Sequence, residues 1–172
     1  AGRVRFDPPQ HKVWEDTRAG ANSPWAWRWM APAVPPDGKY MVNGAFATGI
    51  MLLAWEHNAD KLATLDLPIP EKDGPLPDYL AEVKFNMDWL LKLQFEDGRV
   101  SHKLTRTSFE AMTLPTEDQE KRFFTPWGTA ATANLAAVAA QAARVFQPYD
   151  AAYAERCRKA AEAAMKAIGR PW

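Results

Sequence analysis

Four stretches of this chain carry apolar residues at helical spacing, and breaks rich in proline and glycine separate them. The first stretch, residues 40–57, is apolar and rich in small residues, so it predicts a helix buried on most sides. Its large apolar residues are Met41, Phe46, Ile50, Leu53 and Trp55. Gly44 and Gly49 lower its helix propensity, which indicates close backbone contact with a neighbouring helix.

A second helix is predicted from about residue 77 to residue 94, after a connection over residues 58–77. Glu82, Lys84 and Lys92 lie off its single apolar stripe. The stripe consists of Leu80, Val83, Met87, Leu90 and Leu91.

The second half of the chain predicts two more helices. A tight turn at Asp97-Gly98 leads into an extended and looped segment over residues 99–126. An alanine-rich helix then covers about residues 127–146, with Thr125 as a candidate cap, and a last helix covers about residues 151–168. Because no clear strand pairs are present, the pattern predicts an all-α fold, a bundle of four principal helices.

The first 37 residues differ in character from the rest. Six prolines exclude a long regular helix there and favour an ordered arm or loop. We therefore expect two parts: an N-terminal arm, residues 1–37, packed on a four-helix domain, residues 38–172. Trp25, Trp27 and Trp29 alternate in the arm, so an extended backbone would place all three rings on one face.

The overall composition narrows the possible partners. Twenty-one basic and twenty-one acidic residues cancel, so no net field attracts nucleic acid or an anionic membrane. No apolar run approaches the ~18 residues of a membrane helix, and the chain reads as a soluble protein or as the processed form of a secreted one. His11, His57 and the single cysteine, Cys157, have no metal-ligand spacing around them, and no cofactor motif is present. We expect neither metal nor cofactor.

Several strings in this order and spacing resemble family 9 of the glycoside hydrolases, a cellulase class. The resemblance covers residues 38–57, 78–115 and 125–157, more than half of the chain. It implies part of an (α/α)6 barrel, of which this chain supplies about a third, a β-1,4-glucan (cellulose) ligand and an extracellular location. The strings are Val13 to Asp16, Gly38-Lys39-Tyr40, Val42-Asn43-Gly44, Pro77 to Glu82, Leu91 to Gln94, His102 to Thr105, Thr129 to Val138, Ala143 to Phe146 and Pro148-Tyr149-Asp150.

The catalytic motif of that family is replaced in this chain. Its members carry Asp-Ala-Gly-Asp and one further residue before Gly-Lys-Tyr, which aligns the two aspartates with Ala33 and Pro36. The family's general acid is a glutamate far downstream of the matched region. Since an inverting glycosidase needs two carboxyl groups, the resemblance implies impaired catalysis. The nearest remaining carboxylate is Asp37, whose proline and glycine neighbours favour a turn residue instead.

The resemblance also marks candidate glucan-binding residues. His102 matches a family position at the sugar-binding cleft, although a lone histidine is also a common structural or surface residue. A further candidate is Trp127, a large ring where the family has a small residue. The binding candidates are His102, Lys103, Tyr40, Trp25, Trp27, Trp29 and Trp127.

Two features of the sequence have more than one interpretation. The rings of Trp25, Trp27 and Trp29 either stack on sugars or cover the apolar edge of the bundle, and the covering role is the more favoured. The acidic cluster at residues 117–120 either binds calcium or forms a solvated loop. The absence of an EF-hand spacing favours the solvated loop.

Three functions therefore stay open. The first is a carbohydrate protein related to the glucanases, which either binds β-glucan through its aromatic residues or retains weak hydrolysis. The second is a non-catalytic helical scaffold or interaction module, natural or engineered from a hydrolase fragment. The third is one part of a split hydrolase. For the last two, the open edge of the partial barrel predicts a second copy or a complementing chain as partner.

Overall fold

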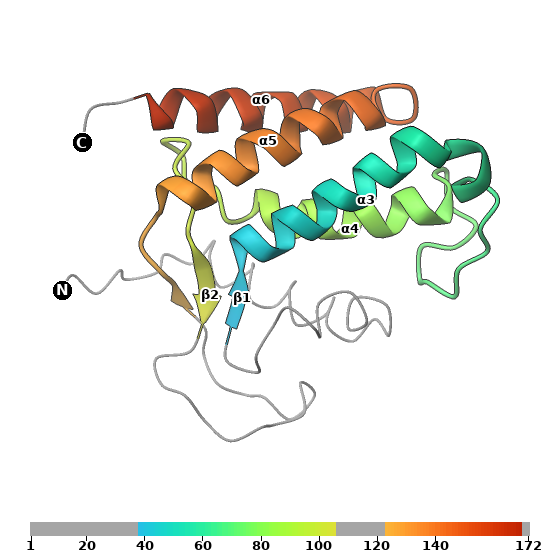
Figure 1. The fold of residues 1–172 in the computed structure, drawn as a ribbon, viewed down its shortest axis with the longest axis horizontal. Coiled ribbons are helices and arrows are strands. Elements are labelled where there is room, and N and C mark those ends of the chain that lie inside the picture. The colour runs from blue at the N-terminus through green and yellow to red at the C-terminus, as the bar shows by residue number, and fades with distance from the viewer. Residues whose placement is uncertain (1–37, 106–122, 170–172) are drawn as a thin grey trace, which may run out of the picture.

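The structure is a computed structural model that describes residues 38–105 and 123–169 (Figure 1). Four helices dominate these residues and confirm the predicted helical class. Three short antiparallel strands form one sheet in the order β1-β2-β3. The helices are α3 (Met41–Leu62), α4 (Asp78–Leu91), α5 (Thr129–Phe146) and α6 (Ala151–Ile168), and the strands are β1 (Gly38–Tyr40), β2 (Lys103–Thr105) and β3 (Phe123–Phe124).

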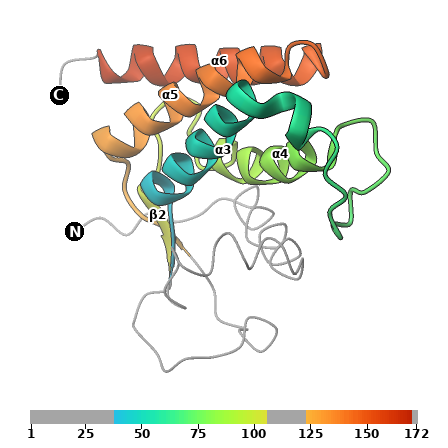
Figure 2. The same cartoon turned by 45° about the vertical axis from the view of Figure 1, so that its right-hand side comes forward.

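Helix α5 lies at the centre of the bundle. It packs most extensively on α6 and next on α3, while α4 packs mainly on α3. Figures 1 and 2 show the sheet at the end of the bundle where α3 and α5 begin. Because β1 runs directly into α3, the sheet is attached to the first turn of this helix. The predicted burial of the helix on most sides is wrong, since Phe46, Ile50 and Leu53 are exposed.

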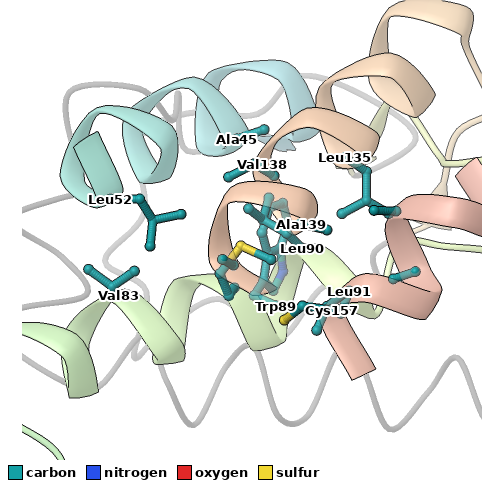
Figure 3. Packing of buried hydrophobic residues seen from close by; sticks show 14 of the residues in the cluster. Ala45, Leu52, Val83, Trp89, Leu90, Leu91, Leu135, Val138, Ala139 and Cys157 are labelled. Atoms are coloured by element: carbon teal, nitrogen blue, oxygen red, sulfur yellow. The ribbon is translucent and has the colours of Figure 1, made fainter. Parts of the chain in front are cut away.

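Glycine residues allow close packing at two places. A methyl group on Gly44 would lie 3.2 Å from Leu90 Cδ2, so side chains of α4 approach α3 closely there. The predicted close backbone contact is wrong, because the atoms nearest to Gly44 and Gly49 belong to side chains. Figure 3 shows Leu90 in the buried cluster between the helices. Gly98 has a φ of 89°, and a methyl group there would lie 2.3 Å from the Ala163 carbonyl oxygen of α6, which no other residue tolerates.

Three details of the predicted elements are wrong. Helix α3 continues past residue 57 to Leu62, with a kink at Asn58, where φ is −140° and ψ is 30°. Helix α5 begins at Thr129 after Gly128, and the Thr125 hydroxyl bonds to the Lys103 backbone instead of capping the helix. The sheet was missed because its strands have two or three residues, too few to show an alternating pattern.

Candidate functional site

The candidate site is at the sheet, where three segments distant in sequence meet. Tyr40, the last residue of β1, pairs with Lys103 of β2. The Met41 amide donates a hydrogen bond of 2.9 Å to the His102 carbonyl oxygen. The first turn of α3 therefore fixes the backbone on which His102 and Lys103 stand.

Three predicted binding residues form one cluster, which we call the Tyr40 cluster: Tyr40, His102 and Lys103. The rings of Tyr40 and His102 meet edge to face, with 5.8 Å between centroids and 79° between planes. Lys103 Nζ lies 5.1 Å from the Tyr40 ring centroid, within the range of a cation–π contact. His102 is exposed, and the other two are half-buried. The cluster thus presents an imidazole, a phenol and an ammonium group at one place.

Two hydroxyl groups hold the strand that carries the cluster. The buried Ser101 Oγ donates to the Thr125 carbonyl oxygen at 2.9 Å. Thr125 Oγ1 accepts from the Lys103 amide at 3.0 Å, so the two segments are bonded through side chains as well as through the ladder. These bonds restrict the backbone on both sides of His102, which preorganises the cluster.

Trp127 lies on the segment next to His102. An antiparallel bridge pairs Ser101 with Trp127, and a methyl group on Gly128 would lie 3.9 Å from His102 Cβ. The Arg99 guanidinium carbon lies 5.0 Å from the Trp127 ring centroid. The indole therefore has a cationic neighbour of its own.

Arg99 was not predicted from the sequence. It follows the Asp97-Gly98 turn, and its Nε donates to Asp97 Oδ2 at 2.6 Å. Arg99 lies two residues before Ser101, and the bridge between Ser101 and Trp127 brings it close to the indole. A local pattern contains no signal for this contact, because the pairing spans more than twenty residues.

Other predicted residues lie outside the described part of the chain. These are the binding candidates Trp25, Trp27 and Trp29, the carboxylate candidate Asp37, the replaced positions Ala33 and Pro36, and the acidic residues 117–120. Within the described residues, no group of three or more histidine, cysteine or acidic side chains is arranged to hold a metal ion. No helix in that part is long and apolar enough to span a membrane.

One buried carboxyl group lies elsewhere, on α4. Glu82 is off the apolar stripe, yet only 2% of it is exposed, because α4 is buried around most of its circumference. Burial, together with the nearby Glu71 carboxylate, raises the pKa of Glu82 to about 7. Leu90 contacts Gly44 near the start of α3, and Glu82 lies two helical turns away from Leu90 along α4. Glu82 therefore belongs to the core and not to the Tyr40 cluster.

Comparisons with known proteins identify the family. The family model for glycosyl hydrolase family 9 matches residues 37–170, so the chain belongs to this family. It is 47% identical over 126 residues to Endoglucanase D of Acetivibrio thermocellus, covering 72% of this chain and 20% of that protein. It is 36% identical over 130 residues to a xyloglucan-specific endo-beta-1,4-glucanase of Bacteroides ovatus, covering 75% and 22%.

A solved structure agrees with the sequence relatives. A metagenome-derived family 9 endoglucanase superposes with a TM-score of 0.73 at 37% identity, over 79% of this chain and 25% of that one. The predicted resemblance to part of an (α/α)6 barrel is thus confirmed. The chain spans about a fifth of the length of the curated relatives described above.

Proposed function

We propose that this glucanase-like chain binds a β-1,4-glucan at the Tyr40 cluster and at Trp127 without hydrolysing it. The observation that carries the proposal is the Tyr40 cluster itself. It joins two segments about sixty residues apart, and it contains a ring face, an imidazole and an ammonium group. Backbone and hydroxyl hydrogen bonds hold it before any ligand arrives.

These groups suit a sugar chain chemically. The apolar face of a glucose ring stacks on aromatic side chains, while its hydroxyl groups need donors and acceptors at the ring edge. Tyr40 and Trp127 supply aromatic surface, and His102 and Lys103 supply the polar partners. The names of the relatives support the same ligand class, since an endoglucanase and a xyloglucan-specific endo-beta-1,4-glucanase are both similar to this chain.

The sequence supports binding without turnover. Inverting hydrolysis needs a carboxylic acid and a carboxylate about 6.5–9.5 Å apart. Ala33 and Pro36 have no proton-accepting group, which leaves Asp37 as the nearest carboxylate in the sequence. Glu82 is buried in the core and lies away from the cluster.

Affinity electrophoresis in hydroxyethylcellulose tests the proposal, with a parallel assay of reducing ends. We expect the chain to be retarded and to release no reducing sugar. Tyr40→Ala and His102→Ala should each weaken binding about five- to tenfold, close to 1 kcal/mol, because each removes one face of the cluster.

Tyr149→Ala is the matched control. Tyr149 is also a partly exposed tyrosine in an aromatic pair, with Trp55, but it follows α5 and lies far along the chain from the sheet. Its removal should leave retardation unchanged. Equal losses from Tyr40→Ala and Tyr149→Ala would show unspecific adsorption, and release of reducing ends that Asp37→Asn abolishes would assign catalysis to Asp37.

A hollow between α5 and α6 supports a second candidate function, a helical interaction module or one part of a split hydrolase. The hollow has a volume of about 640 Å³ and is lined mainly by small apolar side chains. The 61% exposed Met165 stands at its side. If a second copy binds there, sedimentation equilibrium of the chain will show a dimer that Met165→Glu abolishes; a monomer at all concentrations would contradict self-association.

A further inference from the structure

The side chains of Asp97 and Arg99 form a tight pair beside the candidate site. Asp97 Oδ1 accepts from the Arg99 amide at 3.0 Å, and Asp97 Oδ2 accepts from Arg99 Nε at 2.6 Å. Arg99 Nη2 lies 2.5 Å from the same Oδ2. Both side chains are partly exposed, 33% for Asp97 and 42% for Arg99, so the ion pair contributes little to the stability of the fold. The pair instead fixes the plane and the direction of the guanidinium group.

The turn that carries this pair is attached to α6. The Gly98 carbonyl oxygen accepts from Gln94 Nε2 at 3.2 Å, and the same nitrogen donates to the Ala160 carbonyl oxygen of α6 at 2.9 Å. The Phe95 amide donates to the Arg99 carbonyl oxygen at 2.8 Å. These bonds hold the backbone at the base of the Arg99 side chain.

The guanidinium group of Arg99 lies over the indole of Trp127, with 5.0 Å between Arg99 Cζ and the ring centroid. Two contacts fix the backbone around this indole. They are the bridge to Ser101 and the hydrogen bond of 3.1 Å from the Gly128 amide to the Val100 carbonyl oxygen. The remaining freedom is in the two side-chain dihedrals of Trp127. A cation over the ring face restricts both dihedrals, because the contact is lost when the ring turns.

We propose that Asp97 and Arg99 are positioning residues for the glucan site. Asp97 orients the guanidinium group, and the guanidinium group holds the Trp127 indole in the orientation on which a sugar ring stacks. This inference rests on the proposed binding of a β-1,4-glucan. A ring that is held before binding avoids the cost of immobilising one side chain, which is about two- to tenfold in the dissociation constant.

The planar shape of the arginine side chain suits this role. A guanidinium group bonds to a carboxylate through two nitrogens while its face lies on an aromatic ring, whereas a lysine ammonium group is a point charge on a flexible stem. Arg99→Lys therefore keeps the charge but loses the fixed plane. We expect it to bind glucan as weakly as Arg99→Met, and full affinity in Arg99→Lys would overturn the positioning role.

A double-mutant cycle in the full chain tests the inference, with affinity electrophoresis in hydroxyethylcellulose as the measurement. Asp97→Asn keeps the oxygen that accepts from the Arg99 amide and removes the charge that holds the guanidinium group. It should raise the dissociation constant about two- to tenfold. In a Trp127→Ala background the same substitution should have no effect, because the indole that it positions is absent.

Asp88→Asn is the matched control. Asp88 Oδ1 accepts from Arg156 Nη1 at 3.0 Å, and the Arg156 guanidinium carbon lies 6.0 Å from the Tyr153 ring centroid. This pair therefore has the same chemistry as Asp97 and Arg99, but it joins α4 to α6. Its loss should leave the affinity for hydroxyethylcellulose unchanged.

A second measurement reports the orientation of the indole without any ligand. In the full chain labelled with 5-fluorotryptophan, the Trp127 fluorine resonance is assigned by Trp127→Phe. It should shift in Asp97→Asn and in Arg99→Lys and stay in place in Asp88→Asn. An unshifted resonance in Asp97→Asn would overturn the positioning role.

The binding outcomes separate this inference from the proposed function. If the parent chain is retarded and Asp97→Asn binds equally well, or if its loss of affinity persists in the Trp127→Ala background, the positioning role is overturned and the proposed function stands. If the parent chain is not retarded at all, the proposed function is overturned, and the positioning of a sugar platform with it.

Discussion

The carboxyl group of Glu82 lies inside the protein on the second turn of α4, with 2% of the residue exposed. Burial and the nearby Glu71 raise its pKa from the ordinary value of 4.5 to about 7. The folded state therefore holds a proton that the unfolded state releases between these two pH values. Since the folded state binds more protons in that window, its stability falls as pH rises from about 4.5 to about 7, and the loss persists above.

We predict that Glu82→Gln removes this pH dependence. At pH 8 the variant should be more stable than the parent chain by up to about 3 kcal/mol, and at pH 4.5 the two should differ little. Urea unfolding at both pH values measures the difference. Glu96→Gln, a change at an exposed carboxyl group, serves as the control and should preserve the parent's pH dependence. Parallel pH curves for the parent and Glu82→Gln would contradict the assignment.

At the scale of elements, local patterns in the sequence predicted the helices but not the contacts between distant segments. Helix α6 begins and ends as predicted, because the break at Pro148 and the Asp150 cap are encoded locally. The end of α3 was missed, since no breaker precedes Pro68. The sheet and the Arg99–Trp127 contact depend on pairing across many residues, which local periodicity does not contain. The sequence named Tyr40, His102 and Lys103 as binding candidates, and the structure brings the three together; their binding role stays a prediction.

Helix α6 depends on one carboxylate at its start. Asp150 Oδ1 accepts from the Tyr153 amide at 2.9 Å, and Oδ2 accepts from Lys84 Nζ at 2.7 Å. Both bonds lower the pKa of Asp150, Lys84 the more strongly, so their contribution is present above its ordinary pKa of 3.8 and is lost as pH falls through the lowered value. We predict that Asp150→Ala lowers the unfolding free energy by about 1–2 kcal/mol at pH 7, measured by thermal unfolding.

Asp150→Asn is the matched variant, since it keeps a capping oxygen and removes the charge that faces Lys84. It should lose less than Asp150→Ala. An equal loss in both variants would assign the effect to the ion pair and not to the cap.

The turn before β2 is a second element with a single critical residue. Because Gly98 has a positive φ and touches the Ala163 carbonyl of α6, Gly98→Ala should cost more than about 2 kcal/mol. Gly169→Ala is the control, since its added methyl group meets no atom closer than 3.9 Å. Chemical denaturation compares the two variants, and similar midpoints would contradict the close approach.

At the scale of the whole molecule, the sheet end of the described residues carries the binding role that we propose. It holds the Tyr40 cluster and Trp127, where sugar stacking is proposed. Family membership accounts for the helices that support this end. The proposal of binding without hydrolysis rests on the predicted alignment of Ala33 and Pro36 with the two catalytic aspartates of the family.

An NMR titration of the full chain with cellohexaose tests the central claim most directly, because it locates the ligand and reports its integrity together. We predict shifts of the amide signals of residues 38–40, 101–105 and 125–128, with the signals of α6 unchanged and the cellohexaose intact after a day. An unshifted spectrum, shifts confined to the hollow between α5 and α6, or conversion of cellohexaose to shorter sugars would contradict the account.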